Sequence, residues 1–485
     1  MTLAHTESLL HPLRDNDATR LTSVYLVVFI FLISIIPVLK SSGESESMRY
    51  FLQLVLFSVF LLTFFVRSAS FDGRVMTVLA FSPLLGFFVP PRRVGISFLL
   101  LAATLVLITA PRGGFSIKHL MRSNKSLRLL LRMYLAWLGG WTIISLAGVD
   151  AGNSIHQIAL LLFLPLIAII LFLAEELTVG PDDWWAGIKA ALWIAIVFTL
   201  IQIAFGLEYT LFPSLNQNVM LSAATQGMRY PGPFRDAQAF SQFLSVSLSF
   251  CLLYRPKGST VSQIALGLLG FIILLLNGSR MAPFGLLVGV VAAALITPGG
   301  RTKVLIRLGL IAAFVLLVSF FVDVEKIVIV RRFLGTEQDA SFRLGIWIKS
   351  FSIFRAHPWT GIGFENFSEV VLSFVNGGFW QSQQGIVVYN HPESGYLKIL
   401  CETGIIGTTV FVGLIFMVLK QYWNVLRNVN LDASRKDFLA AGFAGYIALL
   451  MSQITVYTMN DPRILFLFGF CSAIPFLYWR EKVRI

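Results

Sequence analysis

The stretch WWAGIKAALWIAIVFTLIQIAFG, residues 184–206, decides the fold of this chain. Lys189 is its only charged residue, and its length allows a helix to cross the hydrocarbon core of a bilayer, which takes about 20 residues. Backbone N–H and C=O groups in lipid must find partners within their own segment, so the stretch is expected to be helical. Comparable apolar runs recur along nearly the whole chain.

The composition of the full sequence agrees with this interpretation. Of its 485 residues, 56% are hydrophobic and 13% are charged, and the mean hydropathy is +0.78. We therefore predict an all-α polytopic membrane protein with about 12 to 14 transmembrane helices. The apolar runs place these helices near residues 22–40, 49–66, 74–89, 94–110, 127–148, 155–175, 184–206, 236–254, 261–277, 281–297, 303–322, 396–420, 438–458 and 463–479.

The runs divide the chain into three parts. We expect N-terminal transmembrane helices at 1–206, a central part at 207–425 with a long loop at 323–392, and C-terminal transmembrane helices at 426–485. A polar segment precedes the first run, which we interpret as a signal anchor and not as a cleaved signal peptide.

Basic residues predict the orientation in the membrane. Lys and Arg gather in the loops that would lie on the side of the N-terminus, so we expect both termini to be cytoplasmic. This topology puts 207–235, 277–281 and the long loop 323–392 together on the outer face. The net charge of +13 follows from the same loops, so we expect contacts with membrane lipids and not with nucleic acid.

The long loop contains a segment with helical periodicity, SFRLGIWIKSFSIFRAHPW at 341–359. Its apolar residues recur at helical spacing, which predicts an amphipathic helix lying at the membrane surface. The residues of this apolar stripe are Leu344, Trp347, Ile348, Phe351 and Phe354. The segment WTGIGFENF at 359–367 follows, and its glycines indicate a tight turn and not a dinucleotide-binding loop, because no strand precedes them.

Two arginines flank a Pro-Gly-Pro turn in GMRYPGPFRDAQAF, residues 227–240. Asp236 stands where the following helix would be capped, and a helix N-terminus with Arg229 and Arg235 beside it suits a phosphate group. The alternative is that both side chains reach toward lipid headgroups.

Arg280 is the one charged residue in LLLNGSRMAPFGLLVG, residues 274–289, between two apolar runs joined by almost no loop. A cation so close to hydrocarbon is costly unless it faces protein, water or an anion. It is therefore a candidate for binding an anionic substrate, with contact to headgroups as the alternative.

A histidine and a glutamate lie together in YNHPESGYLKILCETGIIG, residues 389–407. A neutral imidazole at His391 could accept a proton from a hydroxyl near neutral pH, and Glu393 could orient it or act as the base itself. A solvated loop histidine is the alternative. No zinc pattern, phosphate loop or nucleophile elbow is present, so we expect no metal and no cofactor.

Together these segments resemble the family of O-antigen ligases and Wzy-type polysaccharide polymerases, over roughly residues 200–425. The segments that carry the resemblance are RYPGPFRDAQAFSQFL, NGSRMAPFGLLVG, HPWTGIGFENF and YLKILCETGIIG. The resemblance implies an inverting, metal-independent membrane glycosyltransferase of the GT-C-like type. It would work on the periplasmic face of the bacterial inner membrane.

The resemblance also implies substrates and residue roles. The donor would be a glycan on undecaprenyl pyrophosphate, and the acceptor would be lipid A-core for a ligase or another lipid-linked glycan for a polymerase. The family's pyrophosphate-binding arginines map onto Arg229 and Arg280, with Arg235 a looser match. The family's periplasmic histidine, its base, maps onto His391, but Pro392 follows it here and the spacing to Tyr396 is longer, so Glu393 stays an alternative base.

The sequence favours the polymerase reading, because about fourteen helices with both termini inside suit that branch of the family. The alternative is a ligase, and an alternative of another class is a flippase for lipid-linked oligosaccharides. Glycan-export proteins, such as a flippase or a chain-length regulator, are expected partners of the enzyme.

Overall fold

The computed structural model describes twelve stretches of the chain, and all structural statements below concern these residues. The described stretches are 46–67, 70–87, 97–110, 125–174, 179–211, 229–256, 260–297, 336–374, 379–382, 385–388, 391–428 and 431–477.

The described elements are almost all helices. In chain order they are α2 (Glu46–Arg67), α3 (Phe71–Phe81), the 3₁₀ turn η1 (Ser82–Leu84), α4 (Phe98–Ile108), α6 (Lys125–Leu146), α7 (Ala151–Gln157), the π-helical turn η2 (Ile158–Leu162), α8 (Phe163–Phe172), α9 (Pro181–Phe205), α11 (Ala237–Leu253), α12 (Thr260–Leu276), α13 (Met281–Ile296), α16 (Thr336–Ala356), α17 (Phe367–Phe374), α18 (Gly395–Asn428), α19 (Ala433–Ser452) and α20 (Pro462–Leu477). One antiparallel hairpin, β1 (Phe379–Ser382) and β2 (Gly385–Val388), lies between α17 and α18.

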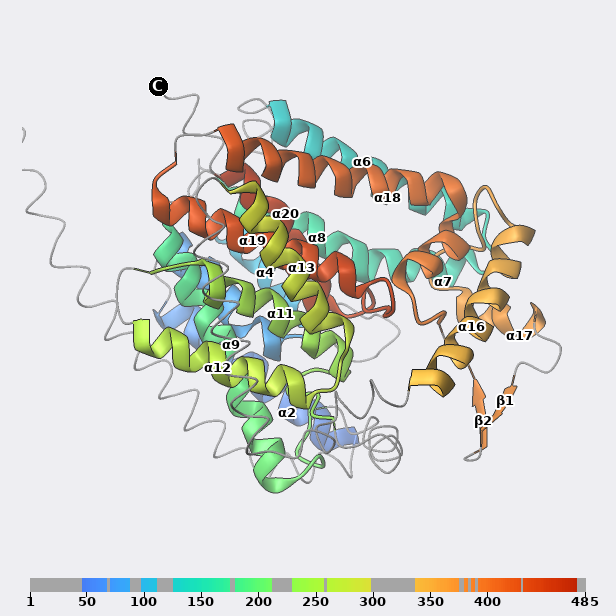
Figure 1. Ribbon diagram of the computed structural model, residues 1–485, viewed down its shortest axis with the longest axis horizontal. Coiled ribbons are helices and arrows are strands. Elements are labelled where there is room, and N and C mark those ends of the chain that lie inside the picture. Colours follow the sequence, from blue (N-terminus) through green and yellow to red (C-terminus); the bar gives the residue numbers. More distant parts are fainter. Residues whose placement is uncertain are drawn as a thin grey trace, which may run out of the picture.

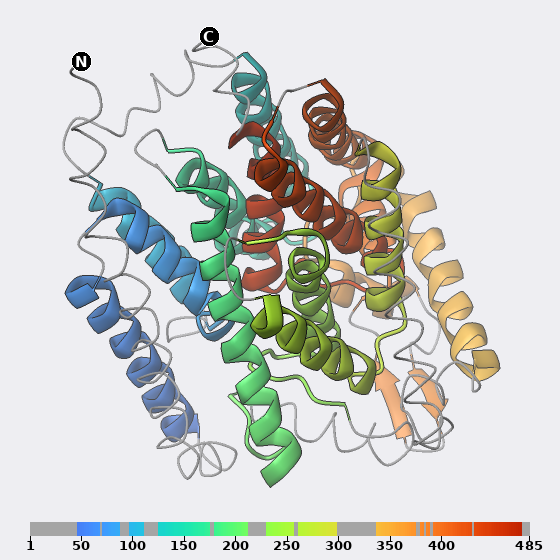
Figure 2. The ribbon, with the colours of Figure 1, turned by 60° about the vertical axis from the view of Figure 1, so that its left-hand side comes forward.

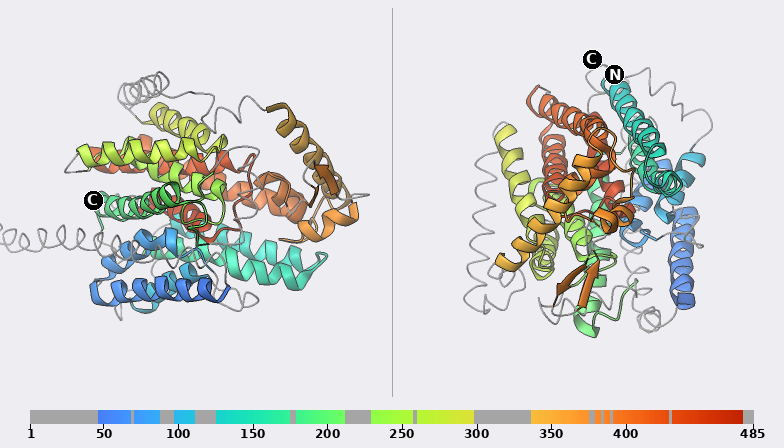
Figure 3. Two further views of the ribbon diagram at one scale, coloured as in Figure 1. Left: turned by 90° about the horizontal axis from the view of Figure 1, so that it is seen from below. Right: turned by 90° about the vertical axis from the view of Figure 1, so that its right-hand side faces the viewer.

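The helices form one bundle, and the elements of the long loop lie at one end of it. In Figure 1, α6 and α18 run side by side, while α16, α17 and the hairpin gather near the N-terminal end of α18. Figure 2 shows α2 and α16 on opposite flanks. Both views in Figure 3 place α16 and the hairpin together at the same end of the bundle. The N-terminal end of α18 therefore lies at this end of the bundle, together with α16 and α17.

The centre of the bundle is built on α20, α11 and α19. Helix α20 is buried from Pro462 to Phe476 and packs against α8 and α19. Helix α13 packs closely on α19 through Gly285 and Gly289, where an added Cβ would meet the backbone of Ala448 and Ala444. Small residues at this spacing let two membrane helices approach each other without a side chain between them.

The prediction of an all-α membrane protein is confirmed. Three described helices are long and apolar enough to cross a membrane, at Leu127–Leu146, Pro181–Phe205 and Gly395–Arg427, and shorter apolar helices accompany them. The expected run at 155–175 is split by the π-helical turn η2. The expected helices at 22–40 and 303–322 lie outside the described residues. Contacts of α19 and α20 with α8, α11 and α13 cross the expected boundaries at 206 and 425, and the three-part division stays a prediction.

The segment expected to form an amphipathic helix is helical, as α16, but its apolar residues lie on more than one face. Leu344, Ile348 and Phe351 of the predicted stripe are exposed, whereas Ile346 and Ile353 on another face are buried against the rest of the protein. Helix α16 packs against α17 and α18. Its exposed apolar stripe suits a membrane surface, which stays a prediction.

Helix α18 is broken at Gly404, and the segment before α17 fills the break. Gly404 has φ of 61°, which interrupts the helical hydrogen-bond ladder. The backbone N–H groups of Ile405 and Ile406 donate instead to the carbonyls of Pro358 and Trp359, at 2.9 and 3.2 Å. On the other side of the break, the carbonyls of Cys401 and Glu402 accept from the N–H groups of residues 362 and 363, at 3.1 and 2.9 Å.

These bonds satisfy backbone groups that a break in a helix would otherwise leave unpaired. The expected tight turn at 359–367 is thus present, with positive φ at Gly361 and Gly363.

Replacing Gly404 with Ala tests the role of the break. A Cβ at this position would overlap the carbonyl of Trp359, and a non-glycine residue in the left-handed region is strained. We expect a loss of about 1–3 kcal/mol in stability, measured as a lower midpoint of thermal unfolding in detergent. Gly413→Ala in the same helix is the control, because only the flexible end of Met133 lies near its Cβ. Equal stability of the two variants would contradict this role.

Candidate active site

Five segments meet at the end of the bundle where α11, α13, α18 and α20 begin. The segments are 229–236 before α11, 277–280 between α12 and α13, 391–394 before α18, 453–461 between α19 and α20, and the first turns of α16. Hydrogen bonds join neighbouring segments: the N–H of Gly395 donates to the carbonyls of Gln453 and Val456, at 2.8 and 3.1 Å. Residues far apart in the sequence thereby share one site.

The Pro-Gly-Pro turn is fixed by buried polar side chains. Gln202 of α9 accepts from the N–H of Gly232 at 2.9 Å and donates to its carbonyl at 3.1 Å. Arg463, which is 2% exposed, donates to the carbonyl of Pro233 at 2.6 Å and pairs with Asp461 at 2.5 Å. The turn is therefore held from two sides, which sets the position of the residues on either side of it.

Arg229 enters the site from this turn. Its Nε donates to the carbonyl of Asn277 at 3.0 Å, while its Nη2 is buried and has no hydrogen-bond partner among the described residues. Burial lowers the pKa of Arg229; the carboxylates of Asp236 and Glu393 oppose this effect, and two neighbouring arginines, Arg343 and Arg280, add to it. A guanidinium with an unfilled donor among other cations suits an anionic ligand.

Arg280 lies on the neighbouring junction. It occupies the position before the first residue of α13, three residues after Asn277, and is half-buried. Its charge acts on Arg229, which places the two guanidinium groups in one electrostatic neighbourhood. Asp236, the N-cap residue of α11, faces the same group: burial raises the pKa of its carboxyl, and the charge of Arg229 opposes that rise.

The histidine and the glutamate form a pair. His391 Nε2 lies 3.3 Å from Glu393 Oε1, and their side chains are 38% and 25% exposed. Burial acts to raise the pKa of Glu393, but the hydrogen bond from His391 and the charges of His391, Arg343 and Arg229 outweigh it, so this pKa is lowered. Glu393 has φ of 50°, an uncommon backbone conformation that often marks a functional site.

A glutamate with a lowered pKa is a poor base near neutral pH but a good hydrogen-bond acceptor for an imidazole N–H. The geometry thus favours His391 as the group that takes a proton and Glu393 as the group that orients it. The ring of Tyr457 lies near that of His391, with ring centroids 6.3 Å apart.

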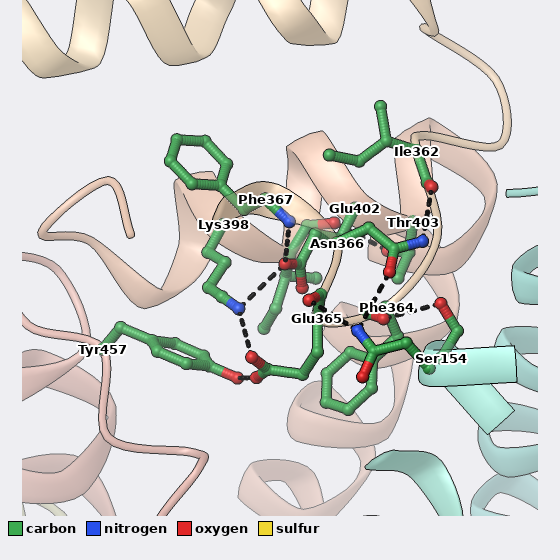
Figure 4. A network of polar contacts seen from close by, with 12 residues as sticks. Ser154, Ile362, Phe364, Glu365, Asn366, Phe367, Lys398, Glu402, Thr403 and Tyr457 are labelled. Carbon is green, nitrogen blue, oxygen red and sulfur yellow. Dashed lines mark hydrogen bonds and ion pairs between the residues drawn. The ribbon is translucent and has the colours of Figure 1, made fainter. Parts of the chain in front are cut away.

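A buried ion cluster (Figure 4) is joined to this pair through Tyr457. Lys398 Nζ is 2.8 Å from both Glu365 Oε2 and Glu402 Oε1, and it lies 4.3 Å from the ring centroid of Tyr457. The Tyr457 hydroxyl donates to Glu365, and the N–H of Phe367 donates to Glu402 at 3.2 Å. The cluster ties the 358–367 segment, α18 and the 453–461 segment together.

Four of the five residues proposed from the sequence come together here: Arg229, Arg280, His391 and Glu393. Arg235 is exposed on the segment before α11. Each assignment to a role stays a prediction.

Sequence reasoning missed two residues that touch this site, Arg343 and Tyr457. Arg343 lies in the predicted amphipathic segment, and a helical wheel alone cannot show that it faces Glu393. Tyr457 lies in a short segment after α19 that carries no motif, and its position follows only from the packing of α19 and α20.

The protein is thus an all-α membrane protein in which arginines lie near a histidine–glutamate pair at one end of the bundle. Residues 265–412 match a family model described as O-antigen ligase. An O-antigen ligase of Pseudomonas aeruginosa is 29% identical over 259 residues, which are 53% of this chain and 56% of that relative. The chain therefore spans about half the length of the curated relative that it matches.

These findings confirm the resemblance to the O-antigen ligase family that the sequence motifs indicate. The matched residues include Arg280, His391 and Glu393, while Arg229 lies before them. Both matches carry the name of the ligase. The preference for a polymerase, which rests on helix number and topology, finds no support in them, and they support the ligase alternative better.

Replacing Lys398 with Met tests the buried cluster. Lys398 and Glu402 are 2% and 1% exposed, so the change leaves the buried carboxylate of Glu402 and the partly buried one of Glu365 without their shared cation. We expect a loss of about 3–5 kcal/mol in stability, as for other broken buried ion pairs, measured by thermal unfolding in detergent. Adding Glu402→Gln to the same variant should recover part of the loss. A single variant as stable as the unchanged protein would contradict the cluster's role.

Proposed function

We propose that this protein is an O-antigen ligase-type glycosyltransferase. In this proposal it transfers a glycan from undecaprenyl pyrophosphate to a sugar of lipid A-core, on the periplasmic face of the inner membrane. The observation that supports it most is the meeting of Arg229 and Arg280 with the His391–Glu393 pair at one end of the bundle. The names of the family model and of the Pseudomonas aeruginosa relative support the ligase over the polymerase.

The reaction assigns each group a task. The acceptor hydroxyl attacks the anomeric carbon of the donor sugar, a new C–O bond forms with inversion, and the bond to the pyrophosphate breaks. The hydroxyl proton passes to His391, whose other ring nitrogen is held by Glu393. The electron pair of the broken bond stays on the pyrophosphate, where Arg229 and Arg280 stabilise the growing negative charge. Because guanidinium groups supply this positive charge, transfer is expected to persist in a metal chelator.

A flippase is the alternative of another class. A flippase would place its charged groups along a central path, whereas Arg229, Arg280 and His391 precede the first residues of α11, α13 and α18. The proposed orientation keeps both termini in the cytoplasm, and the proposed partners are the donor, the acceptor, membrane lipids and glycan-export proteins.

Replacing Arg280 with Ala tests the binding of the leaving group. We expect the rate of transfer by the purified protein to fall at least about 100-fold, the range seen when a group that stabilises transition-state charge is removed. The assay follows glycan transfer from an undecaprenyl-pyrophosphate donor to lipid A-core. Arg235→Ala is the graded comparison, because Arg235 is exposed and its loss should reduce the rate far less. Normal product from the Arg280 variant would remove this arginine from the mechanism.

The pH dependence of transfer tests the assignment of the base. Glu393, with its lowered pKa, stays a carboxylate well below neutral pH, so its protonation cannot cause a decline in rate between pH 8 and pH 5. A decline that the unchanged protein shows over this range should therefore depend on His391. His391→Ala should lower the rate by about 10²- to 10⁴-fold, the usual contribution of a general base, and leave it flat over this range. A decline that persists in His391→Ala would assign the base elsewhere.

A further inference from the structure

Arg343 is a third guanidinium at the site, and it comes from a different part of the chain. It lies on α16, within the long loop, and its side chain is 21% exposed. Its Nη2 is 3.9 Å from Glu393 Oε2, and its Nη1 donates to the carbonyl of Thr455 at 3.4 Å. Both distances are at the outer limit for such contacts, so Arg343 is held only weakly by its present partners.

The backbone that carries Arg343 is well fixed. Two turns further along α16, the carbonyl of Ser350 accepts from the thiol of Cys401 in α18 at 3.0 Å, and Ile346 and Ile353 are buried. Helix α16 is thus anchored by packing and a hydrogen bond, while the guanidinium of Arg343 is held only by two long contacts.

Arg229 lies among other cations. Arg343 and Arg280 both act unfavourably on it, so three guanidinium groups share one neighbourhood, and the carboxylates of Asp236 and Glu393 act on it favourably. The buried Nη2 of Arg229 also lacks a hydrogen-bond acceptor among the described residues. An anion with several oxygen atoms would offset the repulsion among the guanidinium groups and accept from this nitrogen.

We propose that Arg343 is a third pyrophosphate-binding residue, which moves from Glu393 to the donor when the donor binds. This proposal rests on the proposed function and deepens it. Donor binding then removes a cation from Glu393, whose full negative charge acts on His391. The imidazole becomes a stronger base only when the leaving group is in place.

The groups that face His391 and Glu393 come from several elements, and each bears on their titration. They are Arg343 of α16, Arg229 and the N-cap residue Asp236 before α11, and Tyr457 after α19. Burial and the nearby carboxylates Glu365 and Glu402 raise the pKa of Tyr457, which therefore remains a neutral phenol. Arg343 approaches Glu393 at 3.9 Å, and this weak contact can be given up for a contact with the donor.

Binding of undecaprenyl pyrophosphate without a glycan tests the contact directly. The probe is added to the full-length protein in nanodiscs of neutral phosphatidylcholine, and affinity is followed by intrinsic tryptophan fluorescence. Arg343→Gln should weaken binding by about 10- to 100-fold, the loss of one charge-assisted hydrogen bond. Arg343→Lys keeps the charge and should lose less. Arg355→Gln on the same helix is the matched control, because Arg355 is exposed and stacks on Phe351 at 4.9 Å.

Nanodiscs that contain anionic phosphatidylglycerol distinguish the pyrophosphate from lipid headgroups. If Arg343 binds headgroups instead, added phosphatidylglycerol competes with the probe in the unchanged protein and Arg343→Gln removes that competition. That result would overturn the proposal, as would equal affinity of Arg343→Gln and Arg355→Gln.

The pH profile of transfer tests the exchange of partners. The pH dependence of kcat reports the donor complex, and that of kcat/KM reports the free enzyme. In the unchanged protein, the acidic limb of the profile, where the rate falls as the pH is lowered, should lie at higher pH for kcat than for kcat/KM. Arg343→Gln should move the limb of kcat/KM to higher pH and narrow the gap, whereas Arg343→Lys should retain it. An unchanged gap in Arg343→Gln contradicts the exchange. Failure of the proposed function looks different: the unchanged protein then transfers no glycan, whatever residue stands at 343.

Discussion

The break in α18 at Gly404 is the constraint on which the candidate site depends. Inside a membrane, a helix cannot leave N–H and C=O groups unpaired, and a break leaves several. Here the segment 358–363 supplies the partners on both sides of the break. A stretch of the long loop is thereby fastened to the first turns of a core helix. Helix α16, which precedes that segment, and Glu365, which follows it, are placed at the N-terminal end of α18 as a result.

The polar cluster around Lys398 completes this attachment and carries it to the reacting groups. Lys398 joins Glu365 of the attached segment to Glu402 of α18, and the Glu365 carboxylate fixes Tyr457 beside the His391 ring. Arg463 does a similar task on the other flank, where it holds the Pro-Gly-Pro turn that precedes α11. Contacts with neighbouring segments therefore hold the arginines and the His391–Glu393 pair in place, and stabilisation of charge in a transition state requires groups that are positioned in advance.

The sequence could predict most of the helices, because long apolar runs specify helices. It could also predict that the motifs lie at one end of the bundle, because the charges of the loops indicate the side of the membrane on which each loop lies. It could not predict the break, since the periodicity of 395–428 reads through Gly404 and only the backbone conformation shows it. It could not predict the contact of Arg343 with Glu393 or that of Lys398 with Glu365 either, since these partners lie on other elements. The choice between His391 and Glu393 needed the arginines around Glu393, which the spacing of the motif does not contain.

The glycans of a cell that lacks this protein give the most direct test of the central claim, that the site transfers a finished glycan to lipid A-core. Deleting the gene should leave full-length chains attached to undecaprenyl pyrophosphate, with lipid A-core bare, and a copy with Arg280→Ala should not restore the transfer. Loss of long chains, with a single repeat still attached to lipid A-core, would contradict the ligase and indicate a polymerase.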